Sequence, residues 1–156
     1  VETTLARLAE TYRDTEPTIL TIDEASARMP RLAPADGIAA ERYVHMRRVH
    51  AREGRPYCVI DIWLDHAVFR RHPVCFRKET VIPQLLDMPS VRIADARQVL
   101  TIGTADLEVA RLLGTVAGAP VAEVRRVFCA PKRRVIYLGE VIYRGDFVQV
   151  EFDLVP

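Results

Sequence analysis

The C-terminal third of the chain contains three strand-like runs joined by short turns, and this feature constrains the fold most. The runs cover residues 120–130, 135–144 and 147–154, joined by a Pro-Lys-Arg-Arg turn and by the Arg-Gly-Asp turn at residues 144–146. Strands joined by so few residues pair antiparallel, because a parallel connection needs a crossover of a dozen residues or more. The sequence therefore predicts an antiparallel sheet that ends in a hairpin at Arg-Gly-Asp.

The rest of the chain supplies more strands and several short helices. Further strands are expected at 18–23, 42–50, 56–64 and 91–102, the middle two forming a hairpin around a glycine-containing loop. Helical spacing and end signals predict helices at 3–13, 81–87 and 105–113, with a short helix and loop at 66–78 and a loop at 29–40. This order predicts a single α+β domain over residues 1–156, an antiparallel β-sheet with flanking helices on one side.

Composition and charge narrow the class of protein. The chain has 156 residues, 49% of them hydrophobic and 28% charged, which fits one globular domain. With 22 basic and 21 acidic residues the net charge is +1, so direct DNA binding by this segment is not expected. No apolar run reaches the roughly 18 residues of a membrane span. Three widely spaced cysteines (58, 75 and 129) fit no zinc or disulfide pattern and are typical of a cytoplasmic protein.

One face of the run 135–144 has the composition of a pocket wall. Side chains alternate along a strand, so Val135, Tyr137, Gly139, Val141 and Tyr143 share a face. An apolar surface with a few directional hydroxyl groups is typical of small-molecule sites. An ordinary core with tyrosines at its rim has the same composition, and both interpretations stay open.

Three other residues form a candidate anion site. Arg48 and His50 share a face of the run 42–50 and together could clamp a carboxylate or phosphate. A protonated His50 would make that binding depend on pH. Thr80 is a plausible N-cap of the helix at 81–87, where free backbone N–H groups attract anions. The alternatives are solvated basic residues and a cap that binds only its own backbone.

Catalytic and metal signatures are weak. The chain has no nucleophile elbow, phosphate loop or dinucleotide fingerprint, and its four histidines show no convincing metal spacing. Asp61 and Glu140 lie inside apolar strands, where a structural ion pair is the expected role of such an acid. No catalytic residue, metal or cofactor is therefore predicted.

Four segments, taken in order, resemble a known family. They are V-H-M-R-R-V-H-A-R-E-G-R-P (44–56), the helix start Glu79-Thr80, A-D-L-E-V-A-R-L-L-G-T-V-A-G-A-P-V-A-E-V-R-R-V (105–127) and V-I-Y-R-G-D (141–146). Together they resemble the UTRA domain, the effector-binding half of GntR-type transcription regulators of the HutC branch. The resemblance covers residues 18–154, and it assigns the Arg-Gly-Asp triplet to the last hairpin turn of the family rather than to an adhesion loop.

The resemblance implies a fold and a role. UTRA domains are similar in fold to chorismate lyase but bind a small metabolite instead of converting it. They act in the cytoplasm, usually as homodimers, and contact DNA only through an N-terminal winged helix-turn-helix. That module is not in this sequence, so residues 1–17 are expected to lead from it. The alternatives are an enzyme of the chorismate lyase type and a dimerisation module that binds no ligand.

The resemblance also implies site residues, with departures. Arg48 and Thr80 match anion-binding positions of sugar-phosphate-sensing members, His50 replaces a second arginine, and Tyr143 is the tyrosine of the Tyr-Arg-Gly-Asp motif. Tyr137, on the same strand face as Tyr143, stands where those members have an acid. Ile60 replaces a second acid that reads the sugar, and Ile82 replaces an aromatic residue. These changes favour an organic or aromatic carboxylate as the anionic effector over a sugar phosphate.

Overall fold

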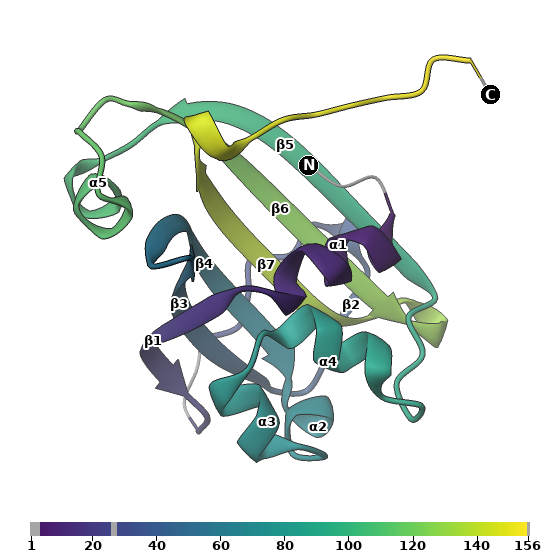
Figure 1. Ribbon diagram of the computed structural model, residues 1–156. Coiled ribbons are helices and arrows are strands. Elements are labelled where there is room, and N and C mark those ends of the chain that lie inside the picture. Colours follow the sequence, from purple (N-terminus) through teal and green to yellow (C-terminus); the bar gives the residue numbers. More distant parts are fainter. Residues whose placement is uncertain (1–3, 26–27, 156) are drawn as a thin grey trace.

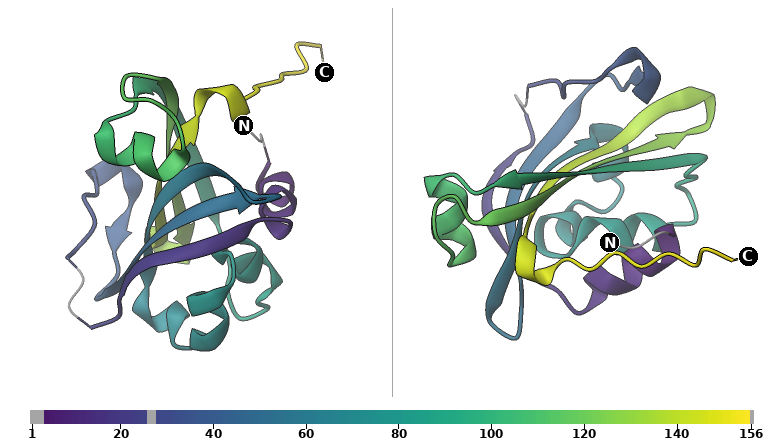
Figure 2. Two further views of the ribbon diagram at one scale, coloured as in Figure 1. Left: turned by 60° about the vertical axis from the view of Figure 1, so that its left-hand side comes forward. Right: turned by 90° about the horizontal axis from the view of Figure 1, so that it is seen from above.

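The computed structural model describes residues 4–25 and 28–155, whose centre is a seven-stranded sheet (Figures 1 and 2). Six strands follow the spatial order β1 (Glu16–Asp23), β3 (Tyr43–Arg52), β4 (Arg55–Asp65), β7 (Arg134–Arg144), β6 (Pro120–Ala130) and β5 (Asp95–Thr104). All neighbours in this order pair antiparallel, and the two-residue β2 (Ile38–Ala39) pairs parallel with the start of β7. The predicted α+β class with a mainly antiparallel sheet is confirmed.

Helices cover the two faces of the sheet unequally. They are α1 (Leu5–Arg13), α2 (His66–Phe69), α3 (Pro73–Lys78), α4 (Val81–Asp87) and α5 (Leu107–Leu113). The first four pack on one face, here called the inner face, and enclose the main hydrophobic core. The last packs at one end of the opposite, outer face, against Val49, Val59 and Val121 (Figure 2). The prediction that all helices lie on one side is wrong for α5. No helix in the described residues is long and apolar enough to cross a membrane.

Helix α5 begins and ends where local chemistry requires. The Asp106 side chain accepts a hydrogen bond from the Val109 N–H at 2.8 Å and so caps the first turn, which places the start at Leu107 rather than at the predicted residue 105. Gly114 ends the helix in the left-handed conformation (φ 64°), as the sequence predicts.

The hairpin predicted at Arg-Gly-Asp is wrong. Gly145–Phe147 forms a 3-10 turn, and the segment that follows, residues 148–155, has no regular secondary structure. The reason is that β4 and β6 occupy both edges of β7, so a strand returning from the turn cannot pair with β7. Gly145 is required for a close approach, since a Cβ there would lie 2.6 Å from the Pro120 carbonyl oxygen.

Two other boundaries differ from the sequence prediction. Strand β5 begins at Asp95, not at residue 91, and the predicted loop 29–40 contains a 3-10 turn (Pro34–Asp36) and β2.

Strand β7 contains a bulge at Ile136. Tyr137 pairs with Phe128 and Val135 with Cys129, so Ile136 has no partner residue in β6. The bulge turns Val135 to the outer face, where it packs on Leu138, so Val135 does not share the face of Tyr137.

Candidate functional site

Two adjacent arginines on β3 have opposite environments. Arg47 points to the outer face and donates to the Asp61 carboxylate at 2.6 Å, which confirms the expected ion pair of Asp61. Arg48 points to the inner face and is fully buried. Its guanidinium donates to the backbone carbonyl oxygens of Glu79, at 2.6 Å, and Phe76. No carboxylate of the described residues binds Arg48.

Strand β6 repeats this pattern with a second arginine pair. Arg125, on the outer face, binds both carboxylate oxygens of Asp36, at 2.9 and 2.8 Å. Arg126, on the inner face, is 1% exposed. It donates to the hydroxyl groups of Tyr12 and Tyr143, both at 3.0 Å, and to one amide oxygen at 3.1 Å. Its partners are all neutral, and sequence reasoning missed this residue.

The inner face therefore contains two buried cations without a carboxylate among the described residues. Removing a guanidinium from water costs several kcal/mol, and proteins normally offset that cost by an ion pair. Burial lowers the pKa of Arg48 to about 10, so Arg48 still carries its charge at neutral pH. On the outer face, by contrast, Arg47 and Arg125 each bind a carboxylate of the chain. An anion from outside the chain would match the inner-face charge.

His50 adds an unused polar group to the same face. It is 2% exposed, and neither ring nitrogen has a hydrogen-bond partner. Burial, followed by the charges of Arg48 and Arg126, lowers the pKa of His50 to about 3. The imidazole is therefore neutral near pH 7 and offers one donor and one acceptor, so the idea of a protonated His50 that senses pH does not hold for this structure.

Tyr137 has a buried hydroxyl without a partner. Its ring stacks on Phe128 with centroids 4.6 Å apart, and its side chain is fully buried. Gly139 makes room for it, since a Cβ at that position would lie 2.5 Å from the Tyr137 hydroxyl oxygen. Gly139 also lies directly opposite Arg126 in the sheet, so the missing side chain leaves space for both groups.

Tyr12 on α1 joins the members of this site. Its ring meets the His50 ring edge-on at 5.3 Å, and its hydroxyl hydrogen-bonds to that of Tyr143 as well as to Arg126. Its carbonyl oxygen accepts a hydrogen bond from the Thr80 hydroxyl at 3.3 Å. Thr80 occupies the N-cap position of α4, as predicted from the sequence, but its side chain makes no capping hydrogen bond.

We define the inner-face cluster as Tyr12, Arg48, His50, Arg126, Tyr137 and Tyr143. The structure brings four predicted residues (Arg48, His50, Tyr137 and Tyr143) onto one sheet face, and the hydroxyl of the fifth, Thr80, hydrogen-bonds to the Tyr12 carbonyl. Arg126 could have been found from strand alternation, which places it on the same face as Val124 and Phe128. Tyr12 gave no such signal, because helical spacing does not tell which part of the sheet a helix covers.

A pocket of about 240 Å³ reaches two members of the cluster, Arg126 and Tyr143. It lies between α1, the loop end of the β3–β4 hairpin and the turn after β7. Its lining residues are Leu8, Thr11, Arg52, Tyr57, Arg126, Tyr143 and 147–149. Phe147 stacks on Tyr57 at 6.0 Å and so forms part of the rim. The pocket joins apolar and aromatic walls to a buried cation.

The described residues offer neither a second anion site on the outer face nor a cluster that could bind a metal ion. A larger hollow of about 490 Å³ on the outer face is lined by Asp61, Glu123 and Glu140 as well as by Arg125, so its charge does not suit an anion. No three His, Cys, Asp or Glu side chains in the described ranges are placed to hold a metal ion.

The fold and this cluster define an α+β domain with a polar, partly aromatic pocket on one face of an antiparallel sheet. The model of the UTRA domain matches residues 12–149. The chain therefore belongs to the UTRA domain family.

Solved structures share the fold. YydK from Bacillus subtilis, described as a possible transcriptional regulator, superposes with a TM-score of 0.75 at 15% identity, over 93% of this chain and 64% of that one. The effector domain of PhnF from Mycobacterium smegmatis gives 0.73 at 16% identity, covering 94% and 93%. The ligand-binding domain of a GntR-family transcriptional regulator from Bordetella bronchiseptica gives 0.68 at 23% identity, covering 90% and 89%. A search of curated proteins finds no match. The chain spans less than two thirds of YydK.

Proposed function

We propose that this chain is the ligand-sensing domain of a GntR-family transcription regulator of the HutC branch, and that it binds a small organic anion at the inner-face cluster. One observation carries the proposal. Among the described residues, no carboxylate binds the buried Arg48 and Arg126, and the His50 ring nitrogens and the Tyr137 hydroxyl have no hydrogen-bond partner. Buried polar groups in native proteins are nearly always satisfied, and an anionic ligand would satisfy several of these at once.

The chemistry of the inner face favours a carboxylate over a sugar phosphate. Ile60 and Ile82 are buried there, and neither can accept hydrogen bonds from sugar hydroxyl groups. Asp61, the acid that follows Ile60 in β4, lies on the outer face and already binds Arg47. The aromatic rings of Tyr12, Tyr57 and Tyr143 instead offer a surface for a planar or apolar ligand body.

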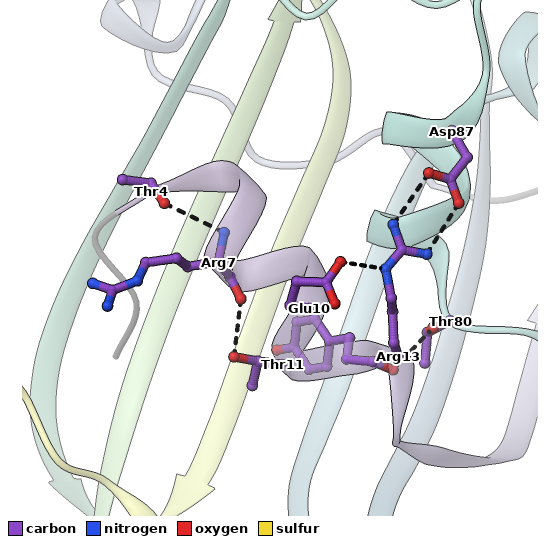
Figure 3. A network of polar contacts seen from close by, with 8 residues as sticks. Thr4, Arg7, Glu10, Thr11, Arg13, Thr80 and Asp87 are labelled. Carbon is purple, nitrogen blue, oxygen red and sulfur yellow. Dashed lines mark hydrogen bonds and ion pairs between the residues drawn. The ribbon is translucent and has the colours of Figure 1, made fainter.

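The signal would travel through α1, which packs on the core through Leu8, Ala9 and Tyr12 and is also held by polar contacts. Arg13 donates to Glu10 at 2.7 Å and to the two Asp87 oxygens at 3.1 Å each (Figure 3). The Thr80 hydroxyl donates to the Tyr12 carbonyl. Below these contacts the Tyr12 hydroxyl binds Arg126. An anion that binds Arg126 competes with that hydroxyl and so changes the anchoring of α1. A ligand shifts such an equilibrium by its difference in affinity for the two states, typically about 1–3 kcal/mol.

The remaining elements of the proposal follow from the family. The regulator would act in the cytoplasm as a homodimer and contact DNA through a winged helix-turn-helix on the N-terminal side of α1. It would bind its effector without converting it. These statements concern the whole regulator, and the resemblance to the GntR-family structures supports them.

Titration calorimetry on the 156-residue chain tests the ligand class. The panel is benzoate, 4-hydroxybenzoate, succinate and glucosamine 6-phosphate. We expect at least one carboxylate to bind and to raise the melting temperature, since ligand at about 100 times its dissociation constant adds about 2.7 kcal/mol. Binding of the sugar phosphate alone would contradict the proposed ligand class. Binding of no compound in the panel would also count against a carboxylate effector. Release of pyruvate from chorismate would contradict the non-catalytic role.

A further inference from the structure

We infer that the C-terminal segment, residues 148–155, forms a β-strand by adding to the free edge of β5 in a second copy of this chain. The inference rests on the proposed function in one respect only, that such a regulator acts as a dimer. It assigns that dimer a surface and a connecting element.

The sequence of the segment is typical of a β-strand, but in the structure the segment has no partner strand. Val148, Val150, Phe152 and Leu154 alternate with Gln149, Glu151 and Asp153, which is the pattern of a half-buried strand. Yet Val150 is 42% exposed, Phe152 66% and Leu154 91%. The Val148 N–H donates to the Gly145 carbonyl, and among the described residues no backbone hydrogen bond pairs residues 150–155 with a strand. Figure 1 shows it leaving the body of the domain.

Strand β5 is an edge that accepts such a strand. It pairs with β6 over ten consecutive residues without a bulge, has no proline, and exposes Val99 (54%) and Ile102 (70%). The other edge strand, β1, is blunted by Pro17 and by a register irregularity between Ile19 and Thr21. A long regular edge with exposed apolar residues is a template for pairing with another chain.

Side-chain chemistry agrees with this pairing. The apolar row of the segment can lie over Leu100 and Ile102 on one face of β5. Its acids then lie on the other face, where β5 carries Arg97 as well as Asp95, and the register must place an acid next to Arg97. Apolar contacts and opposite charges are the cross-strand pairs that stabilise sheets.

The segment cannot use the edge of its own β5 over its full length. From the end of β7 it would have to pass β6 and β5, about 14 Å at about 4.8 Å per strand, which takes roughly four extended residues. About half of the eight residues would then remain to pair. If two copies exchange their segments, each segment can pair over its full length with β5 of the other copy. Such reciprocal exchange about a two-fold axis gives a closed dimer.

Light scattering after gel filtration, which measures the oligomeric state, tests the inference. The variants are a chain truncated after Gln149, which keeps every residue of the pocket, and Phe152→Asp. Val116→Asp, at an exposed apolar residue (73%) outside both surfaces, is the control. We expect the wild-type chain and the control to be dimers, and the two tail variants to dimerise at least tenfold more weakly. A truncated chain that dimerises as well as wild type would overturn the inference.

A second measurement locates the partner edge without relying on a new variant of β5. A peptide of residues 148–156 is added to the truncated chain, and amide hydrogen exchange is followed. We expect slower exchange in residues 95–104, and no effect from the Phe152→Asp peptide. Protection elsewhere, for example in β1, or none at all, would contradict the assignment. Neither assay contains an effector, so a failure here is separate from a failure of the ligand proposal.

Discussion

Replacing Arg126 by methionine should separate stability from ligand binding. Methionine keeps the apolar stem of the side chain but removes a guanidinium that is 1% exposed. The change removes three hydrogen bonds from a charged donor to the neutral acceptors Tyr12, Tyr143 and an amide. At about 1.5 kcal/mol net each, the lower end for a hydrogen bond to a charged group, this loss is about 4.5 kcal/mol. It is offset by the several kcal/mol that desolvating the unpaired charge costs.

The free energy of unfolding should therefore change by no more than about 2 kcal/mol, in either direction, as judged by urea denaturation. Ligand affinity should fall much more. Losing one charge-assisted hydrogen bond of about 1.5–3 kcal/mol should raise the dissociation constant of a carboxylate about 10- to 150-fold, as measured by calorimetry.

Arg125→Met is the matched control, because it lies on the same strand with its guanidinium paired to Asp36 on the outer face. That pair is 35% and 10% exposed, so its loss should cost about 1 kcal/mol and leave ligand affinity within about twofold. A large loss of stability in Arg126→Met with unchanged affinity would refute the reasoning, since Arg126 would then be a structural residue.

Three further substitutions probe the cluster. Arg48→Ala should weaken carboxylate binding by about 1.5–3 kcal/mol in calorimetry, whereas Arg47→Ala on the outer face should not; equal effects would remove Arg48 from the site. Gly139→Ala should destabilise the fold by about 1–3 kcal/mol in urea denaturation, because its Cβ would lie 2.5 Å from the Tyr137 hydroxyl, and a neutral result would mean that the ring moves freely. His50 has a folded pKa of about 3, below the usual 6.5, so the unfolded chain takes up the proton first and stability falls as pH drops from 6.5 toward 3. We expect this residue to account for a loss of about 2 kcal/mol between pH 7 and pH 5, which His50→Gln should lack; parallel pH profiles of the two proteins would contradict the buried, neutral imidazole.

Strand alternation predicted the inner face well where the register is regular. Arg48 and His50 share the inner face of β3 as expected, and Tyr137 and Tyr143 share that of β7. The same rule failed for Val135, because the bulge at Ile136 reverses the alternation. A bulge depends on the partner strand, so one strand read alone does not reveal it.

The features that the sequence did not predict depend on tertiary context. Tyr12 reaches the cluster only because α1 crosses the inner face, and a helical pattern does not specify where its apolar stripe packs. The last segment has the alternation of a strand, but β7 has no free edge within the chain. Whether such a segment pairs depends on the edges available to it.

The central claim is that an organic anion binds both buried arginines of the inner face. The most direct test follows the side-chain Nε–H resonances of arginine by nitrogen-15 NMR during titration with the tightest-binding carboxylate. The account predicts saturable shifts for Arg48 and Arg126 together, with Arg47 and Arg125 unchanged. Shifts confined to the outer-face pair, or none in the inner-face pair at saturation, would contradict it.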